Sequence, residues 1–195
     1  MEFKNSKTAH NLMKAFAGES QARMRYTYYA KIARKQGYVQ IANIFLETAE
    51  NEKEHAKLFW KKLLEHGMNE EVVVLNDAGY PVAMDDTLKN LQYAADGENE
   101  EWTVLYSSFA DDADAEGYKD VATVFRMVAL VEERHEARYR KLHDNIKNHT
   151  VFVKDGKVYW KCLNCGHIME ATEAPAKCPV CLHGREYFEL WKETY

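Results

Sequence analysis

Two Glu-x-x-His motifs in the chain could hold a pair of metal ions. Glu52 and His55 make the first motif, and Glu132 and His135 repeat it at an offset of 80 residues. Residues three apart in an α-helix share a face, so each motif can direct one carboxylate and one imidazole toward a common point. Two such helices packed face to face would form a dinuclear site, whose oxygen and nitrogen ligands suit iron or manganese.

Three further glutamates are candidate ligands in the segments that precede these motifs. Glu19 follows Gly18, Glu98 follows Gly97, and Glu101 lies about one helical turn after Glu98. Buried charges without partners are costly, so five glutamates on inward helix faces would require compensating cations. One Glu from each of two helices, with Glu-x-x-His from each of two others, is the ligand set of dinuclear carboxylate bundles.

Other interpretations of these residues stay open on the sequence alone. The duplicated motifs could be surface pairs or part of a metal-free bundle, but their place within apolar stripes favours a buried metal site. Glu101 follows Glu100, and one of these two side chains is expected to be solvated. Tyr26 and Tyr106 either fill the core with satisfied hydroxyls or donate hydrogen bonds to ligating carboxylates.

Four long helices must position these ligands, because the apolar residues around them recur at helical spacing. Gly37 and Gly117 lie between consecutive helices and are expected to end the first helix of each pair. Each half of the repeat is therefore predicted to be an antiparallel helical hairpin. The link between the hairpins, residues 67–86, is long for a helix connection and could run the length of the bundle. We therefore predict an all-α, ferritin-like four-helix bundle with one long crossover, along which the apolar residues 72–75 pack or pair.

The two halves of the repeat differ by one residue. Gly18 and Glu19 match Gly97 and Glu98 at an offset of 79, whereas Tyr26 matches Tyr106 at 80. The extra residue therefore lies between Glu101 and Tyr106. A helix absorbs a single inserted residue most easily as a π-bulge, so we predict one there.

All four cysteines lie near the C-terminus in two C-x-x-C pairs, Cys162 with Cys165 and Cys178 with Cys181. Four thiolates at this spacing predict a tetrahedral site for a single iron or a structural zinc, and the spacing does not choose between them. Acidic residues around the cysteines argue against a nucleic-acid-binding ribbon. We predict two domains, a bundle over residues 1–148 and a metal-binding module over residues 149–195.

The overall composition fits a folded protein without a membrane segment. Hydrophobic residues make up 46% of the chain and the net charge is −5, which argues against a general nucleic-acid binder. No stretch has the length and apolar character of a membrane span, and the N-terminal residues lack the apolar core of a signal peptide. We therefore expect a cytoplasmic protein.

Together these motifs resemble the rubrerythrin family, in the arrangement with the bundle first and a rubredoxin-like β module last. The resemblance covers nearly the whole chain and includes Gly166 after the first cysteine pair and Pro179 within the second. His167 departs from the pattern, because many relatives have tyrosine there. The change could alter hydrogen bonding near the thiolates without removing a ligand.

The resemblance implies a non-haem di-iron peroxidase that reduces hydrogen peroxide to water in oxidative-stress defence. Electrons would come from an external reductase, in the manner of an NADH peroxidase, through one iron held by the four cysteines, where zinc can take its place in recombinant protein. A homodimer or higher homo-oligomer, with the module of one subunit near the bundle site of another, is also implied. Iron storage or ferroxidase activity is the alternative, which the cysteine module disfavours, and a metal or redox sensor is a third hypothesis.

The resemblance also implies roles for the individual bundle ligands. Glu52 and Glu132 would bridge two irons. Glu19 would bind the first iron, while Glu98 and His135 would bind the second. The remaining two ligands, Glu101 and His55, would exchange on the first iron as its oxidation state changes.

Overall fold

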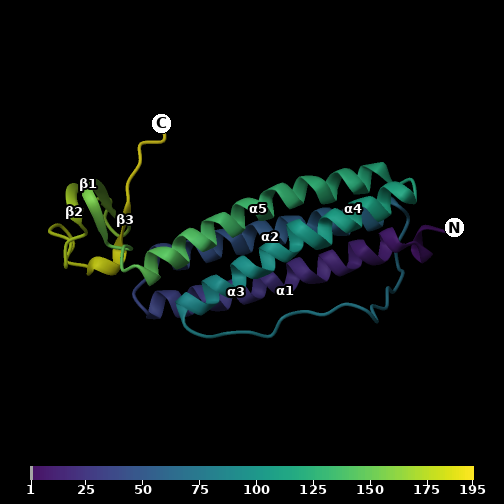
Figure 1. Cartoon of the computed structure of the whole chain (residues 1–195), viewed down its shortest axis with the longest axis horizontal. Helices are drawn as coiled ribbons and strands as arrows, with labels where there is room; N and C mark the ends of the chain where they lie inside the picture. The colour runs from purple at the N-terminus through teal and green to yellow at the C-terminus, as the bar shows by residue number, and fades with distance from the viewer. Residues whose placement is uncertain (1) are drawn as a thin grey trace.

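The computed structural model describes residues 2–195, which form a long helical bundle with a small β-sheet module at one end (Figure 1). A π-helical turn, η2, joins α3 to α4 in one continuous helix. With that pair counted as one, the predicted four-helix bundle is confirmed, as is the predicted π-bulge. The helical elements are η1 (Phe3–Asn5), α1 (Lys7–Lys35), α2 (Val39–Glu65), α3 (Thr87–Glu100), η2 (Glu101–Leu105), α4 (Tyr106–Ala115), α5 (Lys119–Lys147) and η3 (Arg185–Tyr187).

Both hairpins turn at the predicted glycines, Gly37 and Gly117, which have φ values of +82° and +89°. Only glycine adopts this left-handed conformation without strain, so both helices end where the sequence predicted.

The residue before each of these glycines forms a hydrogen bond between the two hairpins. Gln36 Oε1 accepts a hydrogen bond of 2.8 Å from the backbone N–H of Thr87, and the Glu116 carboxylate accepts one of 2.9 Å from that of Thr8. The repeat is therefore visible in the contacts between the hairpins as well as in the sequence.

The crossover between α2 and α3 runs along the outside of α1 and α3 without regular structure (Figure 1). It is attached to α1 by side chains, because Lys14 Nζ lies 2.7 Å from Asp77 Oδ2 and the Tyr29 hydroxyl donates a 2.6 Å hydrogen bond to a crossover carbonyl. The expectation for residues 72–75 is only partly correct. Val73 packs against the core, whereas the side chains on either side of it are exposed to solvent.

Two aromatic-rich clusters form the core, and a layer of buried polar side chains separates them. On α1, Leu12 belongs to one cluster and Tyr26 to the other, with Glu19 between them. On α2, Phe45 and Phe59 are divided in the same way by the first Glu-x-x-His motif. The bundle therefore surrounds its polar layer with apolar packing on both sides.

The C-terminal module is a three-stranded antiparallel sheet in the order β2-β1-β3. Its core contains Trp160 and Phe188 beside two of the cysteines. Tyr38, at the α1–α2 turn, stacks on Phe152 with a centroid separation of 6.4 Å, which places the module against that end of the bundle. The strands are β1 (Val153–Cys162), β2 (Ile168–Glu173) and β3 (Phe188–Leu190).

Among residues 2–195, none of the helices combines the length and apolar character of a membrane span.

Candidate metal centre

Six of the seven predicted bundle ligands converge in the polar layer. They form two groups of four, and within each group one ligand atom per residue lies within 4.8 Å of the others. Both groups contain Glu52 from α2 and Glu132 from α5. The residues found in one group only are Glu19 and His55 in the first, and Glu98 and His135 in the second.

Burial and short contacts characterise the layer. Glu19 and Glu132 are completely buried, and His55 and His135 are 8% and 4% exposed. Each imidazole Nδ1 lies 2.7 Å from one oxygen of Glu132. Yet neither of these oxygens has a hydrogen-bond partner among the described residues, because the contacts lack hydrogen-bond geometry. Buried polar atoms normally have partners, so these atoms point to a missing bonding interaction.

The electrostatics of the layer lead to the same inference. Burial, with the charge of Glu52, raises the pKa of Glu19 to about 8, and the same two causes raise the pKa of Glu98 well above its ordinary value. Burial works to lower the pKa of His135, but contacts with Glu132 and Glu52 outweigh it and raise the pKa to about 12. Without cations, therefore, the layer retains protons that these groups would release in water.

Two tyrosines hold the outer carboxylates in place. The Tyr26 hydroxyl donates a 2.6 Å hydrogen bond to Glu98 Oε1, and the Tyr106 hydroxyl donates a short hydrogen bond to Glu19 Oε1. Each bond connects the two hairpins, because Tyr26 lies on α1 and Tyr106 on α4. Of the two roles left open by the sequence, the structure shows hydrogen bonding to the candidate ligands.

Glu101, the seventh predicted ligand, lies at the edge of the layer. It begins the π-helical turn and belongs to neither group of four. It is also the one predicted bundle ligand, among these seven described residues, that is only partly buried. Burial, with the charges of Glu19 and Glu98, raises its pKa well above the ordinary value, so its carboxyl group lies within electrostatic range of the others.

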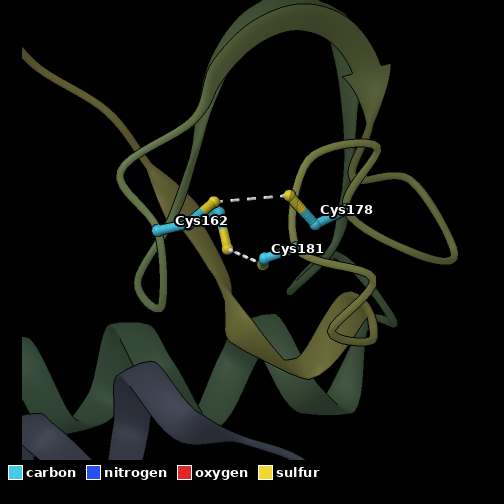
Figure 2. A group of neighbouring side chains, drawn as sticks. Cys162, Cys178 and Cys181 are labelled. Atoms are coloured by element: carbon cyan, nitrogen blue, oxygen red, sulfur yellow. Dashed lines mark hydrogen bonds between the residues drawn. The ribbon is translucent and has the colours of Figure 1, made fainter.

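The sulfurs of Cys162, Cys178 and Cys181 point toward one another in the C-terminal module (Figure 2). Cys165 belongs to the same group, in which all four sulfurs lie within 4.8 Å of one another. Cys162 Sγ lies 3.7 Å from Cys181 Sγ, and Cys165 Sγ lies 3.6 Å from Cys178 Sγ. Four sulfurs bound tetrahedrally at about 2.3 Å would be about 3.8 Å apart. The predicted tetrathiolate site therefore has the spacing that an iron or zinc ion requires.

Two similar backbone loops present these sulfurs. In the first loop the Cys162 N–H donates to the His167 carbonyl at 2.8 Å, and in the second the Cys178 N–H donates to the His183 carbonyl at the same distance. Gly166 and Leu182, at equivalent positions, both have positive φ. The departure at His167 thus leaves the loop hydrogen bond intact, because the backbone carbonyl provides it.

Comparison with known proteins identifies the family. The family model described as Rubrerythrin matches residues 10–156, and the model described as Rubrerythrin, rubredoxin-like domain matches residues 160–189. The chain belongs to the rubrerythrin family. The rubrerythrin of Clostridium perfringens is 59% identical over 193 residues, which cover 98% of each chain.

Solved structures support the same architecture for this rubrerythrin-family chain. A structure of nigerythrin in a partially reduced state aligns with a TM-score of 0.64 and 31% identity, over 96% of this chain and 90% of that one. The bacterioferritin of Desulfovibrio desulfuricans aligns with a TM-score of 0.65 over 76% of this chain and 85% of that one. At 23% identity, this second match shows the fold alone. The ferritin-like bundle and the rubredoxin-like module are confirmed.

The residues of both centres fit the metals of a rubrerythrin, a di-iron site in the bundle and a four-cysteine site in the module. Ligand atoms that share an ion, with bonds of about 2.1 Å, lie about 3 Å apart. The contacts of 2.7 and 3.3 Å from His55 Nδ1 to Glu132 and Glu52 are close to this value. Glu132 Oε1, which has no hydrogen-bond partner among the described residues, is thus placed to share an ion with His55 and Glu52 Oε2.

One buried residue next to the site was not predicted from the sequence. Glu136 is 9% exposed and accepts hydrogen bonds from Trp102 Nε1 at 2.6 Å, Asn99 Nδ2 at 3.0 Å and Arg140 Nε at 2.6 Å. It ties the π-helical turn to α5 directly beside His135. The sequence shows an acidic residue, Glu136, directly after the second Glu-x-x-His motif and a tryptophan, Trp102, in the segment with the inserted residue. The positions of these two residues in the sequence do not indicate that their side chains meet.

We expect the metal-free protein to lose stability as the pH rises. The pKa of Glu19 is about 8 in the folded chain against an ordinary value of 4.5, so between these values the folded state binds more protons than the unfolded state. The free energy of unfolding therefore falls as the pH rises from about 5 to 8, and the raised pKa of His135 acts in the same direction above its ordinary value of 6.5.

Calorimetric melting temperatures of chelator-treated protein at several pH values in this range would test the expectation. The metal-loaded protein is the control, because metal ligation keeps the carboxylates deprotonated and should remove the decline. A melting temperature of the metal-free protein that stays constant or increases with pH would contradict the prediction.

Proposed function

We propose that this protein is a peroxidase that reduces hydrogen peroxide to water in defence against oxidative stress. The observation that carries the proposal is the pair of buried ligand groups that share Glu52 and Glu132, in a chain that also holds four converging thiolates. A site for two irons suits a two-electron reduction, and a tetrathiolate iron suits the delivery of single electrons. Zinc in the module could not deliver them, because it has no accessible redox couple.

Each group of ligands would hold one iron, and the two shared glutamates would bridge the pair. Glu19 and His55 would complete the first iron's ligands, and Glu98 and His135 those of the second. When bound, the two ferrous ions supply the electrons that cleave the O–O bond and act as Lewis acids toward its oxygens. Tyr26 and Tyr106 fix the orientation of the outer carboxylates through their hydrogen bonds.

The module of the same chain lies beyond the end of the bundle (Figure 1). From His135 to Lys147, where α5 ends, the helix extends about 18 Å at 1.5 Å per residue. This separation favours a head-to-tail homodimer, in which the module of one subunit serves the bundle of its partner. An external reductase would supply the module with electrons.

Anaerobic mixing of the reduced, iron-loaded protein with hydrogen peroxide tests the function. A peroxidase should consume one peroxide for each two electrons drawn from the bundle irons, and should turn over repeatedly when a reductant is supplied. Iron storage is the competing function, and it predicts uptake of iron far beyond the three metal positions of each chain. Uptake of that kind, or failure to turn over peroxide, would refute the proposal.

Glu101 would act as an exchangeable ligand of the first iron, so its removal should affect turnover more than iron content. We expect Glu101→Ala to lower the rate of peroxide reduction by roughly tenfold or more while both bundle irons stay bound. Stopped-flow kinetics with iron analysis measures both quantities. Glu54→Ala, which removes an exposed carboxylate from α2, is the control. An unchanged rate in Glu101→Ala would exclude the exchange.

A further inference from the structure

A cavity of about 330 Å³ lies between the crossover, α1 and the continuous helix formed by α3, η2 and α4. Residues from all three contribute to its lining, including Arg25 of α1, Ala78 and Tyr80 of the crossover, and Glu101 of η2. A water molecule takes about 30 Å³ of liquid volume, so the cavity can hold several waters or a molecule of similar polarity.

The inner part of the cavity lies beside the metal ligands. Glu101 and Tyr106 both line it. Tyr106 donates its hydroxyl to Glu19, and Glu101 lies within electrostatic range of Glu19 and Glu98. The six converging ligands are buried, whereas Glu101 is partly exposed. A small molecule in this cavity can therefore contact Tyr106, which is hydrogen-bonded to the ligand Glu19, and Glu101 beside it.

Two helical glycines line the cavity, Gly18 of α1 and Gly97 of α3. A Cβ atom at Gly18 would lie 3.9 Å from Tyr80 Cε1, and one at Gly97 would lie 3.9 Å from Arg25 Nη2. Anything larger than a methyl group at either position would therefore extend into the space between these walls. Both glycines are helical, where glycine costs about 1 kcal/mol of stability relative to alanine. The repeat places them directly before Glu19 and Glu98, so the opening is built next to both outer ligands.

Arg25 is a charged residue in the cavity lining. Arg25 Nε donates a 2.7 Å hydrogen bond to Gln21 Oε1, which fixes the guanidinium group. Arg25 Nη1 is buried and has no hydrogen-bond partner among the described residues. Arg25 and Glu101 both line the cavity, which gives it the polar character suited to a neutral oxygen compound that accepts and donates hydrogen bonds.

Contacts with α1 hold the outer wall in position. Asp77 pairs with Lys14 Nζ at 2.7 Å, and the Tyr80 hydroxyl donates a 3.1 Å hydrogen bond to the Lys14 carbonyl. Ala78, a small residue between these two anchors, lines the cavity. The crossover thus provides a fixed wall whose bulk can be changed without touching a metal ligand.

We infer that this cavity is the route by which hydrogen peroxide enters the bundle site, with Arg25 and Glu101 among the polar groups along it and the crossover as its outer wall. The inference rests on the proposed peroxidase function and specifies how the substrate reaches the irons. It also assigns a functional role to the long crossover, beyond that of a connection between hairpins.

Graded obstruction of the cavity in the iron-loaded full chain tests this route. Ala78→Leu and Ala78→Trp add bulk at the cavity wall, and Val82→Trp introduces the same large side chain at a fully exposed crossover position outside it. Two rates are measured by stopped-flow absorbance: oxidation of the reduced protein by hydrogen peroxide, and binding of azide, a small probe, to the oxidised protein. Both should fall with side-chain size, by about tenfold for Ala78→Trp, while Val82→Trp stays near the unsubstituted rates.

The azide rate separates failure of the route from failure of the proposed function. Slowed azide binding in a protein that never reacts with peroxide would support the route and refute the peroxidase. Equal azide and peroxide rates in iron-replete Ala78→Trp and Val82→Trp would overturn the route. If both Ala78 variants lose iron, Tyr80→Ala decides: widening the wall should accelerate azide binding, and an unchanged rate would overturn the inference.

Discussion

Replacement of Glu52 by alanine is expected to empty both iron positions of the bundle rather than one. Glu52 belongs to both ligand groups, and its side chain is 1% exposed at the centre of the polar layer. Its removal takes a ligand from each ion and leaves the remaining carboxylates with less cation to balance them. Metal analysis should show the bundle irons falling from two per chain to nearly none, while the module retains its metal.

Two comparisons make the Glu52 experiment specific. Glu98→Ala removes a ligand from one group only and should weaken one iron position more than the other. Glu54→Ala, an exposed change on the same helix, should leave both irons bound. Full iron occupancy in Glu52→Ala would contradict the bridging role, and loss of module metal would indicate general unfolding instead.

The parts of the structure that the sequence predicted are those encoded by regular spacing. The offset between Glu52 and Glu132 implied equivalent positions on two helices, and the structure brings both into each ligand group. A change of offset from 79 to 80 located the inserted residue, and the π-helical turn lies there. Helical periodicity fixes the face on which a side chain lies, so counting residues was sufficient for these features.

The spacing of residues in the sequence could not predict features that depend on contacts between helices, strands and the crossover. The two roles of Tyr26 could be separated only by the distance from its hydroxyl to Glu98. Val73 packs against the core while Val72 and Val74 are exposed, because the course of the crossover is set by its attachments to α1, such as the Lys14 ion pair. The hydrogen bonds of Glu136 to the π-helical turn likewise depend on how α5 packs beside it.

Replacement of Cys178 by serine is expected to abolish turnover driven by a reductase while leaving the direct reaction of the reduced bundle with peroxide intact. Cys178 is buried in the module core, and its sulfur lies 3.6 Å from that of Cys165. A serine oxygen is a poor substitute for a soft thiolate ligand, so the tetrathiolate iron should be lost or its redox potential changed. The bundle ligands lie on other elements and should keep their irons.

The two activities must be measured on the same preparation. Steady-state peroxide consumption with a reductase tests the relay, and single-turnover oxidation of the chemically reduced protein tests the bundle. Leu182→Gly is the control for a change in the module that leaves its metal bound. It alters the residue of the second loop that is equivalent to Gly166 and keeps all four thiolates. This control should retain both activities, because glycine adopts the positive φ of that position readily. Loss of both activities in Cys178→Ser, with the bundle irons still bound, would contradict a relay that is separate from the peroxide site.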